Sequence, residues 1–366
     1  MTDKLKMPLV GALVAIIAVT LVFLGNPANM GFCIACFLRD TAGALGLHSN
    51  PAVQYARPEI IGLILGAFIT SIFTKEFSTK GGSAPVTRFV LGVCMMIGAL
   101  IFLGCPLRML LRIAGGDLNA VVGLFGFTAG IICGIFFLNR GFTLKRTYNV
   151  SKTDGFGLPL FNILLLAALI FVPTILLFSA EGPGAAHAPL VISLAAGLIV
   201  GAVGFISRLC FAGGIRDAIL FKKASSLTMF IALVVVAAIG NILLGKFNLG
   251  FENQPIAHTD GLWNFLGLTL VGFGATLLGG CPFKQLILAG SGNSDSTMTV
   301  LGMFVGAALA HNLGMASSAK GVTTNGKTGF FIAAVVMIGI AVYNTSFNKK
   351  AVEAVEANET TEAEDI

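Results

Sequence analysis

Ten long stretches of this sequence carry no charged residue, and they decide what the chain can fold into. Most of them reach 18 residues or more, and about 20 apolar residues cross a bilayer as a helix. Only 11% of the chain is charged, against about 25% in soluble proteins. Because unpaired backbone groups are costly in lipid, the sequence predicts an all-α polytopic membrane protein with about ten transmembrane helices. The expected spans are 8–25, 60–74, 89–107, 118–138, 158–180, 188–207, 226–245, 261–279, 297–316 and 328–346.

The basic residues between these stretches predict the orientation of the chain. Lys and Arg gather in the cytoplasmic loops of membrane proteins. With ten spans and the N-terminus inside, 16 of the 23 basic residues fall on the inner side and 7 on the outer side. Both termini are therefore expected to be cytoplasmic. The first stretch, flanked by Lys4 and Lys6, is interpreted as a retained helix rather than a signal peptide.

Two motifs of the first half recur in the second half. "GFCIACFLRD" (31–40) aligns with "RLCFAGGIRD" (208–217), and "GCPLRMLLRIAGGD" (104–117) aligns with "GCPFKQLILAGSGN" (280–293). The offsets of 177 and 176 residues are nearly constant, which indicates an internal duplication. The predicted units are a first transmembrane repeat over 1–180, a second repeat over 181–350 and a disordered acidic tail over 351–366.

An odd number of spans in each half inverts the second half in the membrane. Inverted repeats of this kind are typical of transporters. The four motif segments, only 10–20 residues long, are too short to span and are expected to be re-entrant half-helices. The segments of Cys33 and Cys105 should enter from outside, those of Cys210 and Cys281 from inside, and all four should meet near the midplane.

The residues of these segments favour binding of an anion. Gly-Cys-Pro followed by an apolar run predicts a helix start, which places Cys105 and Cys281 at the N-cap, beside free amides and the positive end of the helix dipole. The basic residues of the motifs either attract that anion or pair with Asp40 and Asp217, the expected structural charge partners. The predicted substrate path comprises Cys33, Cys36, Cys105, Cys210, Cys281, Arg39, Arg108, Arg216 and Lys284.

The other cysteines and the histidines are interpreted as structural. Cys94 and Cys133 lie inside spans without a repeat partner, as small buried hydrophobes do. Cys36 completes a Cys-x-x-Cys, but its counterpart is Gly213. The thiols of the path either stay protonated and donate hydrogen bonds, or are thiolates that handle sulfur or selenium covalently. A soft metal such as Cu(I) or Zn is ranked well below an anion, because the neighbouring Arg and Lys oppose a cation; no metal or cofactor is expected.

At these motifs the sequence resembles the YeeE/YedE family of sulfur-transport membrane proteins, and most closely the YedE branch associated with selenium metabolism. The resemblance covers the chain up to the acidic tail. The motifs that carry it are "NMGFCIACFLRDTAGALGLH", "GCPLRMLLRIAGGDLNA", "SRLCFAGGIRDA" and "GGCPFKQLILAGSGNSDS".

The resemblance implies a channel-like transporter of the bacterial inner membrane whose central path is lined by cysteines. In the thiosulfate-transporting members the thiols contact the anion in turn, a role that falls here on Cys33, Cys105 and Cys281, with Cys210 as the matching thiol. Cys36 and the added spans depart from those shorter transporters. The implied cytoplasmic partners are small sulfur-carrier proteins of the TusA/SirA/YedF type.

The function expected from the sequence is import of a small selenium- or sulfur-containing compound, with a selenium compound favoured and no enzymatic turnover. The partners expected are this solute, the lipid bilayer and a sulfur carrier, with no nucleic acid. The alternatives are a thiosulfate or sulfur-oxyanion importer, a membrane thiol oxidoreductase that uses Cys33 and Cys36, and a scaffold that only docks a sulfur carrier.

Overall fold

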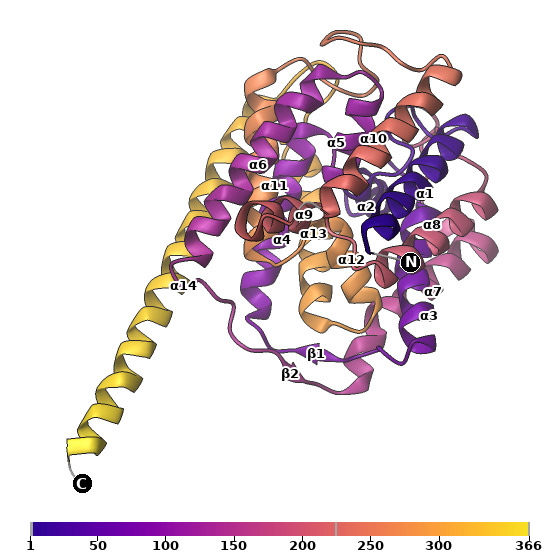
Figure 1. The fold of residues 1–366 in the computed structure, drawn as a ribbon. Coiled ribbons are helices and arrows are strands. Elements are labelled where there is room, and N and C mark those ends of the chain that lie inside the picture. Colours follow the sequence, from indigo (N-terminus) through magenta and orange to yellow (C-terminus); the bar gives the residue numbers. More distant parts are fainter. Residues whose placement is uncertain (1–2, 224, 365–366) are drawn as a thin grey trace.

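The computed structural model describes residues 3–223 and 225–364, and long helices dominate it (Figure 1). The elements of the first half are α1 (Asp3–Phe23), α2 (Ile34–Ala44), α3 (Pro58–Phe73), β1 (Lys80–Gly81), α4 (Pro85–Phe102), α5 (Pro106–Ala114), α6 (Leu118–Leu138), β2 (Tyr148–Asn149), α7 (Lys152–Phe171) and the 3₁₀ helix η1 (Pro173–Ile175). Those of the second half are α8 (Leu190–Ile206), α9 (Phe211–Phe221), α10 (Ser225–Leu243), α11 (Gly261–Leu277), α12 (Pro282–Gly290), α13 (Ser294–Asn312) and α14 (Thr324–Glu364).

The long helices confirm the predicted all-α polytopic class. Within the described residues, eight helical stretches are long and apolar enough to cross a membrane, and some of them join a long helix to the short one after it, as in Pro85–Ala114. Two expected spans are not among these eight. The stretch 60–74 corresponds to α3, an apolar helix of only 16 residues, and the stretch 297–316 corresponds to α13, which opens on Ser-Asp-Ser-Thr.

The two halves have the same order of helices. In each half a long helix is followed by a short one, two long ones, a second short one and two more long ones. The short helices α2, α5, α9 and α12 have 9 to 11 residues, which gives them a length of about 14–17 Å. That is about half of the 30 Å hydrocarbon core, as predicted for half-helices.

The packing of the long helices follows the same duplication. Helix α1 packs against α10 and α3 against α8, while α4 packs against α13 and α6 against α11. If each helix is replaced by its repeat counterpart, the α1–α10 pair becomes the α8–α3 pair, and the α4–α13 pair becomes the α11–α6 pair. These pairs approach closely: a Cβ added at Gly126 of α6 would overlap the carbonyl oxygen of Phe265 in α11. Small residues permit such backbone contact between membrane helices.

One side of the molecule carries the two strands and the end of the apolar part of α14, and we call it the terminus face. The first turns of α1 lie beside Ser207, and Arg208 forms an ion pair of 3.1 Å with Glu76 in the α3–α4 connection. Strand β1 of that connection pairs with β2 of the α6–α7 connection. Tyr343 lies near the C-terminal end of the part of α14 that is apolar enough to cross a membrane, beside residues of the same two connections. The strands and the C-terminus mark this face at the bottom of Figure 1.

The opposite side, which we call the far face, is formed by the counterparts of these connections. The N–H of Leu118, the first residue of α6, donates to Gly250 O in the α10–α11 connection at 3.0 Å. Asp260 of that connection accepts a hydrogen bond of 3.2 Å from the N–H of Val322, between α13 and α14. The α3–α4 and α10–α11 connections are repeat counterparts on opposite faces. The halves are therefore inverted with respect to each other.

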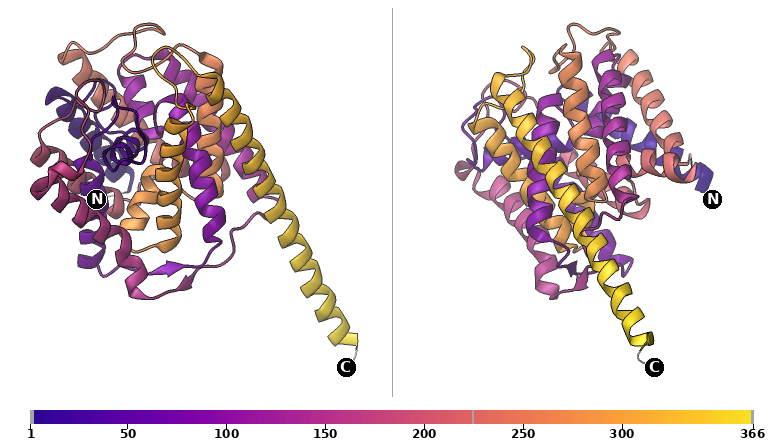
Figure 2. Two further views of the ribbon diagram at one scale, coloured as in Figure 1. Left: turned by 180° about the vertical axis from the view of Figure 1, so that it is seen from behind. Right: turned by 90° about the vertical axis from the view of Figure 1, so that its left-hand side faces the viewer.

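Helix α14 ends later than the sequence led us to expect. It continues through the acidic tail to Glu364 and projects away from the bundle (Figure 2), where the sequence led us to expect disorder over 351–366. The tail is rich in Ala and Glu and contains neither Gly nor Pro, so its intrinsic helix propensity is high. Residues 365–366 lie outside the described residues.

Candidate functional site

Each of the four repeated cysteines caps the N-terminus of a short helix. Cys33 precedes α2, Cys105 precedes α5, Cys210 precedes α9 and Cys281 precedes α12. The thiol of Cys33 accepts a hydrogen bond of 3.3 Å from the N–H of Cys36. The thiol of Cys210 accepts the equivalent bond from Gly213 at 3.2 Å. Sulfur thus satisfies one of the free amides at each of these two helix starts.

The four thiols are arranged as two pairs, one in each half. Cys105 contacts Cys33 side chain to side chain, and its sulfur also accepts from the N–H of Ile34 at 3.3 Å. Cys281 contacts Cys210 in the same way and lies against the N–H of Phe211. We call Cys33 and Cys105 the far-face pair and Cys210 and Cys281 the terminus-face pair. All four residues are buried.

The two pairs lie on half-helices that meet across the repeat. Helix α2 contacts α12, and α5 contacts α9. Among the described residues, no group of three or more His, Cys, Asp and Glu side chains is arranged to hold a metal ion. The described thiols are therefore two separate pairs and not one four-thiol metal cluster.

Cys36 adds a third thiol to the far-face pair only. Its sulfur accepts a hydrogen bond of 3.4 Å from Nη1 of Arg108 and lies 3.8 Å from the carbonyl oxygen of Leu103. Its repeat counterpart, Gly213, has no side chain. The two ends of the thiol array are thus chemically different.

Arg108 is a fully buried cation held by neutral groups. Its Nε donates to Asn29 O at 3.2 Å and its Nη2 to Ile256 O at 3.1 Å, while Nη1 contacts Leu103 O as well as the Cys36 thiol. Within the part of the chain that the structure describes, no carboxylate forms a salt bridge with it. A buried charge needs compensation, and a guanidinium binds oxyanions strongly. This site therefore favours an anion.

Arg39 is paired with Asp40 instead. Asp40 accepts from Arg39 at 2.7 Å and from Arg57 at 2.8 Å, so one carboxylate balances two buried guanidinium groups. In the second half, Arg216 pairs with Asp217 at 2.9 Å. Of the two alternatives from the sequence, the structure shows the pairing for both arginines.

Lys284 lies one turn into α12, beside the terminus-face pair. Its backbone N–H is directed at the thiol of Cys281, and its ammonium is close enough to Cys210 to act on it electrostatically. Lys284 is partly buried. Both thiol pairs thus have a cationic side chain nearby.

Sequence reasoning missed two charged groups near the far-face pair. Arg57 joins the Asp40 pair from the residue before α3 and also lies over the ring of Phe37, 4.7 Å from its centroid. Arg112 pairs with Asp117 at 2.6 Å. Each of these arginines lies beside an apolar run at a helix boundary, and this pattern could have indicated a buried charge. Neither arginine has a basic counterpart in the other half, so the repeat did not indicate them.

The remaining cysteines and histidines have structural surroundings. Cys94 is buried as expected, whereas Cys133 is exposed on α6, so the expectation of a small buried hydrophobe is wrong for Cys133. His258 contacts Ile101 O at 2.8 Å, and the ring of His48 stacks on His311 at 4.6 Å. Burial lowers the pKa of both loop histidines, His48 and His258.

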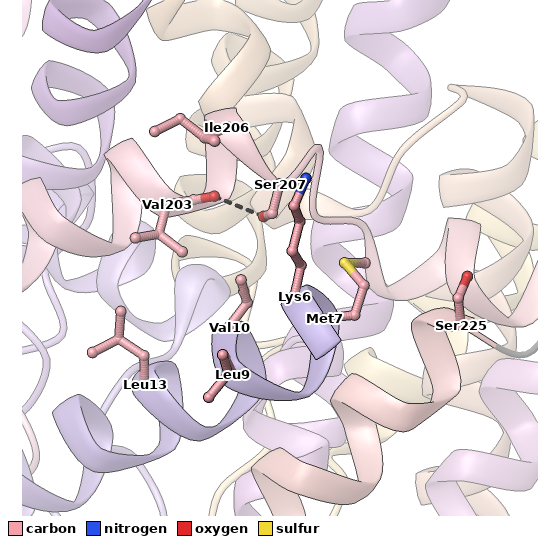
Figure 3. Close-up of a pocket in the computed structure, with 9 residues that line it drawn as sticks. All are labelled: Lys6, Met7, Leu9, Val10, Leu13, Val203, Ile206, Ser207 and Ser225. Carbon is pink, nitrogen blue, oxygen red and sulfur yellow. Dashed lines mark hydrogen bonds between the residues drawn. The ribbon is translucent and has the colours of Figure 1, made fainter. Parts of the chain in front are cut away.

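A cavity of about 590 Å³ in the described chain does not contain the thiols. It lies between the first turns of α1 and the end of α8, where Leu9, Leu13 and Val203 give it a mainly apolar lining (Figure 3). Charge and sulfur, not cavity size, therefore mark the candidate site.

Comparison with known proteins agrees with this assignment for the second half. The sulphur transport family matches residues 206–362, which include the terminus-face pair and both second-half motifs. No curated protein matches the chain. The second half of the chain is thus similar to sulphur transport proteins, and together with the multi-pass helical fold this similarity supports a sulfur-related membrane transporter.

Proposed function

We propose that this protein imports a small selenium- or sulfur-containing anion across the bacterial inner membrane, through a path lined by its two thiol pairs. The observation that carries the proposal is the repeated, buried Cys–Cys contact. A single thiol pair at one helix start could be explained by packing alone, because cysteine is a small side chain that is often buried. Two such pairs, related by an inverted repeat and entered from opposite faces, favour a route through the molecule.

The charges give this route its selectivity. An anion arriving from the far face meets Arg108, whose buried guanidinium has only neutral groups as described partners. It then passes the far-face pair and the terminus-face pair, where Lys284 provides a second cation. In this conformation the exposed fraction of the five cysteines of the path is 9% or less, so the helices that carry them have to move for passage.

A selenium compound is favoured over thiosulfate as the cargo. Cys36 adds a third soft sulfur atom to the far-face pair, and soft ligands suit soft partners. Thiosulfate or another sulfur oxyanion is the alternative cargo of the same path. On the cytoplasmic side, a TusA/SirA/YedF-type sulfur carrier would receive the imported atom. The concentration of Lys and Arg on the terminus face supports cytoplasmic termini.

A second candidate function, a membrane thiol oxidoreductase, is favoured by one contact. Cys33 and Cys36 lie within hydrogen-bonding distance of each other, as a redox-active Cys-x-x-Cys would. Both are fully buried in this conformation, however, so a disulfide substrate has no access to them here. Reduction of a disulfide substrate by the purified protein, with oxidation of Cys33 and Cys36 to a disulfide, would support this candidate, whereas a protein without such activity that still transports would exclude it.

The test of the proposed function is uptake into proteoliposomes. Selenite, selenide, thiosulfate, sulfite and sulfate are supplied outside, and the trapped selenium or sulfur is measured against protein-free liposomes. We expect at least one of these anions to accumulate, and the Cys94→Ala variant to match the native chain because Cys94 has no repeat counterpart. Uptake no faster than in protein-free liposomes for all five would refute the proposal, as would unchanged uptake after removal of both thiol pairs.

A further inference from the structure

A second cavity, of about 240 Å³, opens on the terminus face close to the terminus-face pair. We call it the release cavity. It is bounded by both cysteine-capped segments of the second half: Arg216 lies on α9, six residues after Cys210, and Leu277 to Gly279 form the turn before Cys281. The cavity therefore lies next to the inner end of the proposed path.

The described lining of the release cavity is basic. Arg88, Lys145 and Arg216 line it, and none of its lining residues is acidic. Two of these cations are held in place from outside the lining. Arg216 is fixed by Asp217 at 2.9 Å, and Arg88 donates to Ser83 O at 2.7 Å while Asp295 lies 4.0 Å away. Fixed cations around a small cavity attract and orient an anion.

The same motif is closed on the far face. There Arg39 is 3% exposed and Asp40 is fully buried, whereas Arg216 and Asp217 are 29% and 38% exposed. Among the described residues, Asp217 forms a salt bridge with Arg216 alone, whereas Asp40 is also covered by Arg57. The accessible Arg-Asp motif is therefore specific to the terminus face.

We propose that the release cavity is an anion-binding site that holds the transported ion after it leaves the terminus-face pair. The ligand class is a small inorganic sulfur or selenium anion, of the size of thiosulfate or selenite, because the volume admits such an ion with a few waters. The proposal rests on the proposed function for the direction of transport. Anion binding at this cavity is testable without any transport.

The first measurement is thermal unfolding of the purified full-length protein in detergent. Thiosulfate is titrated against sodium chloride at constant ionic strength, since a ligand that binds the folded state raises the unfolding midpoint. We expect Lys145→Gln and Arg216→Gln to raise the thiosulfate concentration for half of the midpoint shift by about tenfold, and Arg216→Lys to bind nearly as the native chain does. Arg146→Gln is the matched control, because Arg146 is exposed beside Lys145 but does not line the cavity.

A steric variant tests the same cavity without removing a charge. Gly279 has φ +75°, and a Cβ built there meets no atom within 4 Å. Asn tolerates this conformation better than most residues do, so Gly279→Asn places a side chain in the cavity. We expect it to weaken thiosulfate binding as well. If the charge variants and Gly279→Asn all bind thiosulfate like the native chain, the proposal is overturned.

The second measurement relates the release cavity to transport. In oriented proteoliposomes, Lys145→Gln should raise the half-saturating thiosulfate concentration for flux from the terminus face and leave that from the far face unchanged. An equal increase from both faces would contradict a site at the inner end. If the native chain transports nothing but binds thiosulfate at this cavity, the proposed function fails while the site stands.

Discussion

At the scale of single residues, the central question is what the buried thiols contribute. Cys105 and Cys281 start half-helices at equivalent positions, and each contacts the second thiol of its pair. A thiol in this place can donate a hydrogen bond to a passing anion, or its thiolate can attack the outer sulfur of thiosulfate, forming a persulfide and releasing sulfite. Serine separates these roles, because it keeps a donor of similar size and cannot form a bond to sulfur or selenium.

We therefore predict different outcomes for serine and alanine at Cys105 and Cys281. If the thiols are donors, the serine variants keep most of the uptake rate. The alanine variants then lose about tenfold or more, since a hydrogen bond to a charged group contributes about 1.5–3 kcal/mol. If the cargo is carried covalently, serine and alanine are equally inactive although both proteins fold. Initial uptake rates in proteoliposomes distinguish the two mechanisms, and full transport by the Cys105→Ala, Cys281→Ala double variant would contradict both.

The two aspartates of the repeated motif differ in the cost of their removal. Asp40 is fully buried between two arginines, so Asp40→Asn should destabilise the fold by about 3–5 kcal/mol, as breaking a buried ion pair does. Asp217 is 38% exposed, and Asp217→Asn should cost about 1 kcal/mol or less. Unfolding midpoints in detergent and the yield of monodisperse protein measure the difference. Equal losses in the two variants would show that burial does not set the role of this pair.

At the scale of elements, the sequence predicted the half-helices better than it predicted their surroundings. Gly-Cys-Pro located the N-caps of α5 and α12, because Pro fits the first helical position and interrupts the preceding helix. The capping role of Cys33 and Cys210 was not predicted, since neither has a Pro after it. The pairing of Arg57 with Asp40, 17 residues away, depends on a tertiary contact that no local pattern specifies. Asp117 lies only five residues after Arg112, so this pairing was open to prediction from the sequence.

The sequence also did not predict which helices pack against each other, although it contains the glycines that allow their close packing. In the α6–α11 pair, a methyl group on Gly126 would overlap the carbonyl of Phe265. We predict that Gly126→Ala lowers the unfolding midpoint and the yield of folded protein, because the two helices have to separate. Gly339→Ala on α14 is the control: nothing lies within 4 Å of its added methyl, and alanine favours the helix by up to about 1 kcal/mol. A Gly126→Ala protein as stable as Gly339→Ala would contradict the close contact.

At the scale of the whole molecule, the inverted repeat makes the two faces alike in plan and different in charge. The α1–α10 pair and the α3–α8 pair are equivalent contacts related by the repeat. The far face buries its Arg-Asp motif, and the terminus face exposes it beside a basic cavity. An anion that crosses such a molecule meets a closed end and an open end in this conformation. If the first half adopted the conformation of the second half and the second that of the first, the far face would become the open end. Inverted repeats alternate access between the two sides of a membrane in this way.

The last prediction concerns how this molecule lies in the membrane. Glu76 and Glu252 occupy repeat-related connections on opposite faces, and both are exposed. In intact cells, an impermeant thiol reagent should label Glu252→Cys and spare Glu76→Cys until the membrane is permeabilised, because the basic terminus face is expected in the cytoplasm. A Cys133→Ser background removes the exposed native thiol, and that background without an added cysteine measures reaction at the buried ones. Labelling of both positions from the same side would rule out the inverted repeat, whereas the reverse pattern would keep the repeat and overturn the orientation.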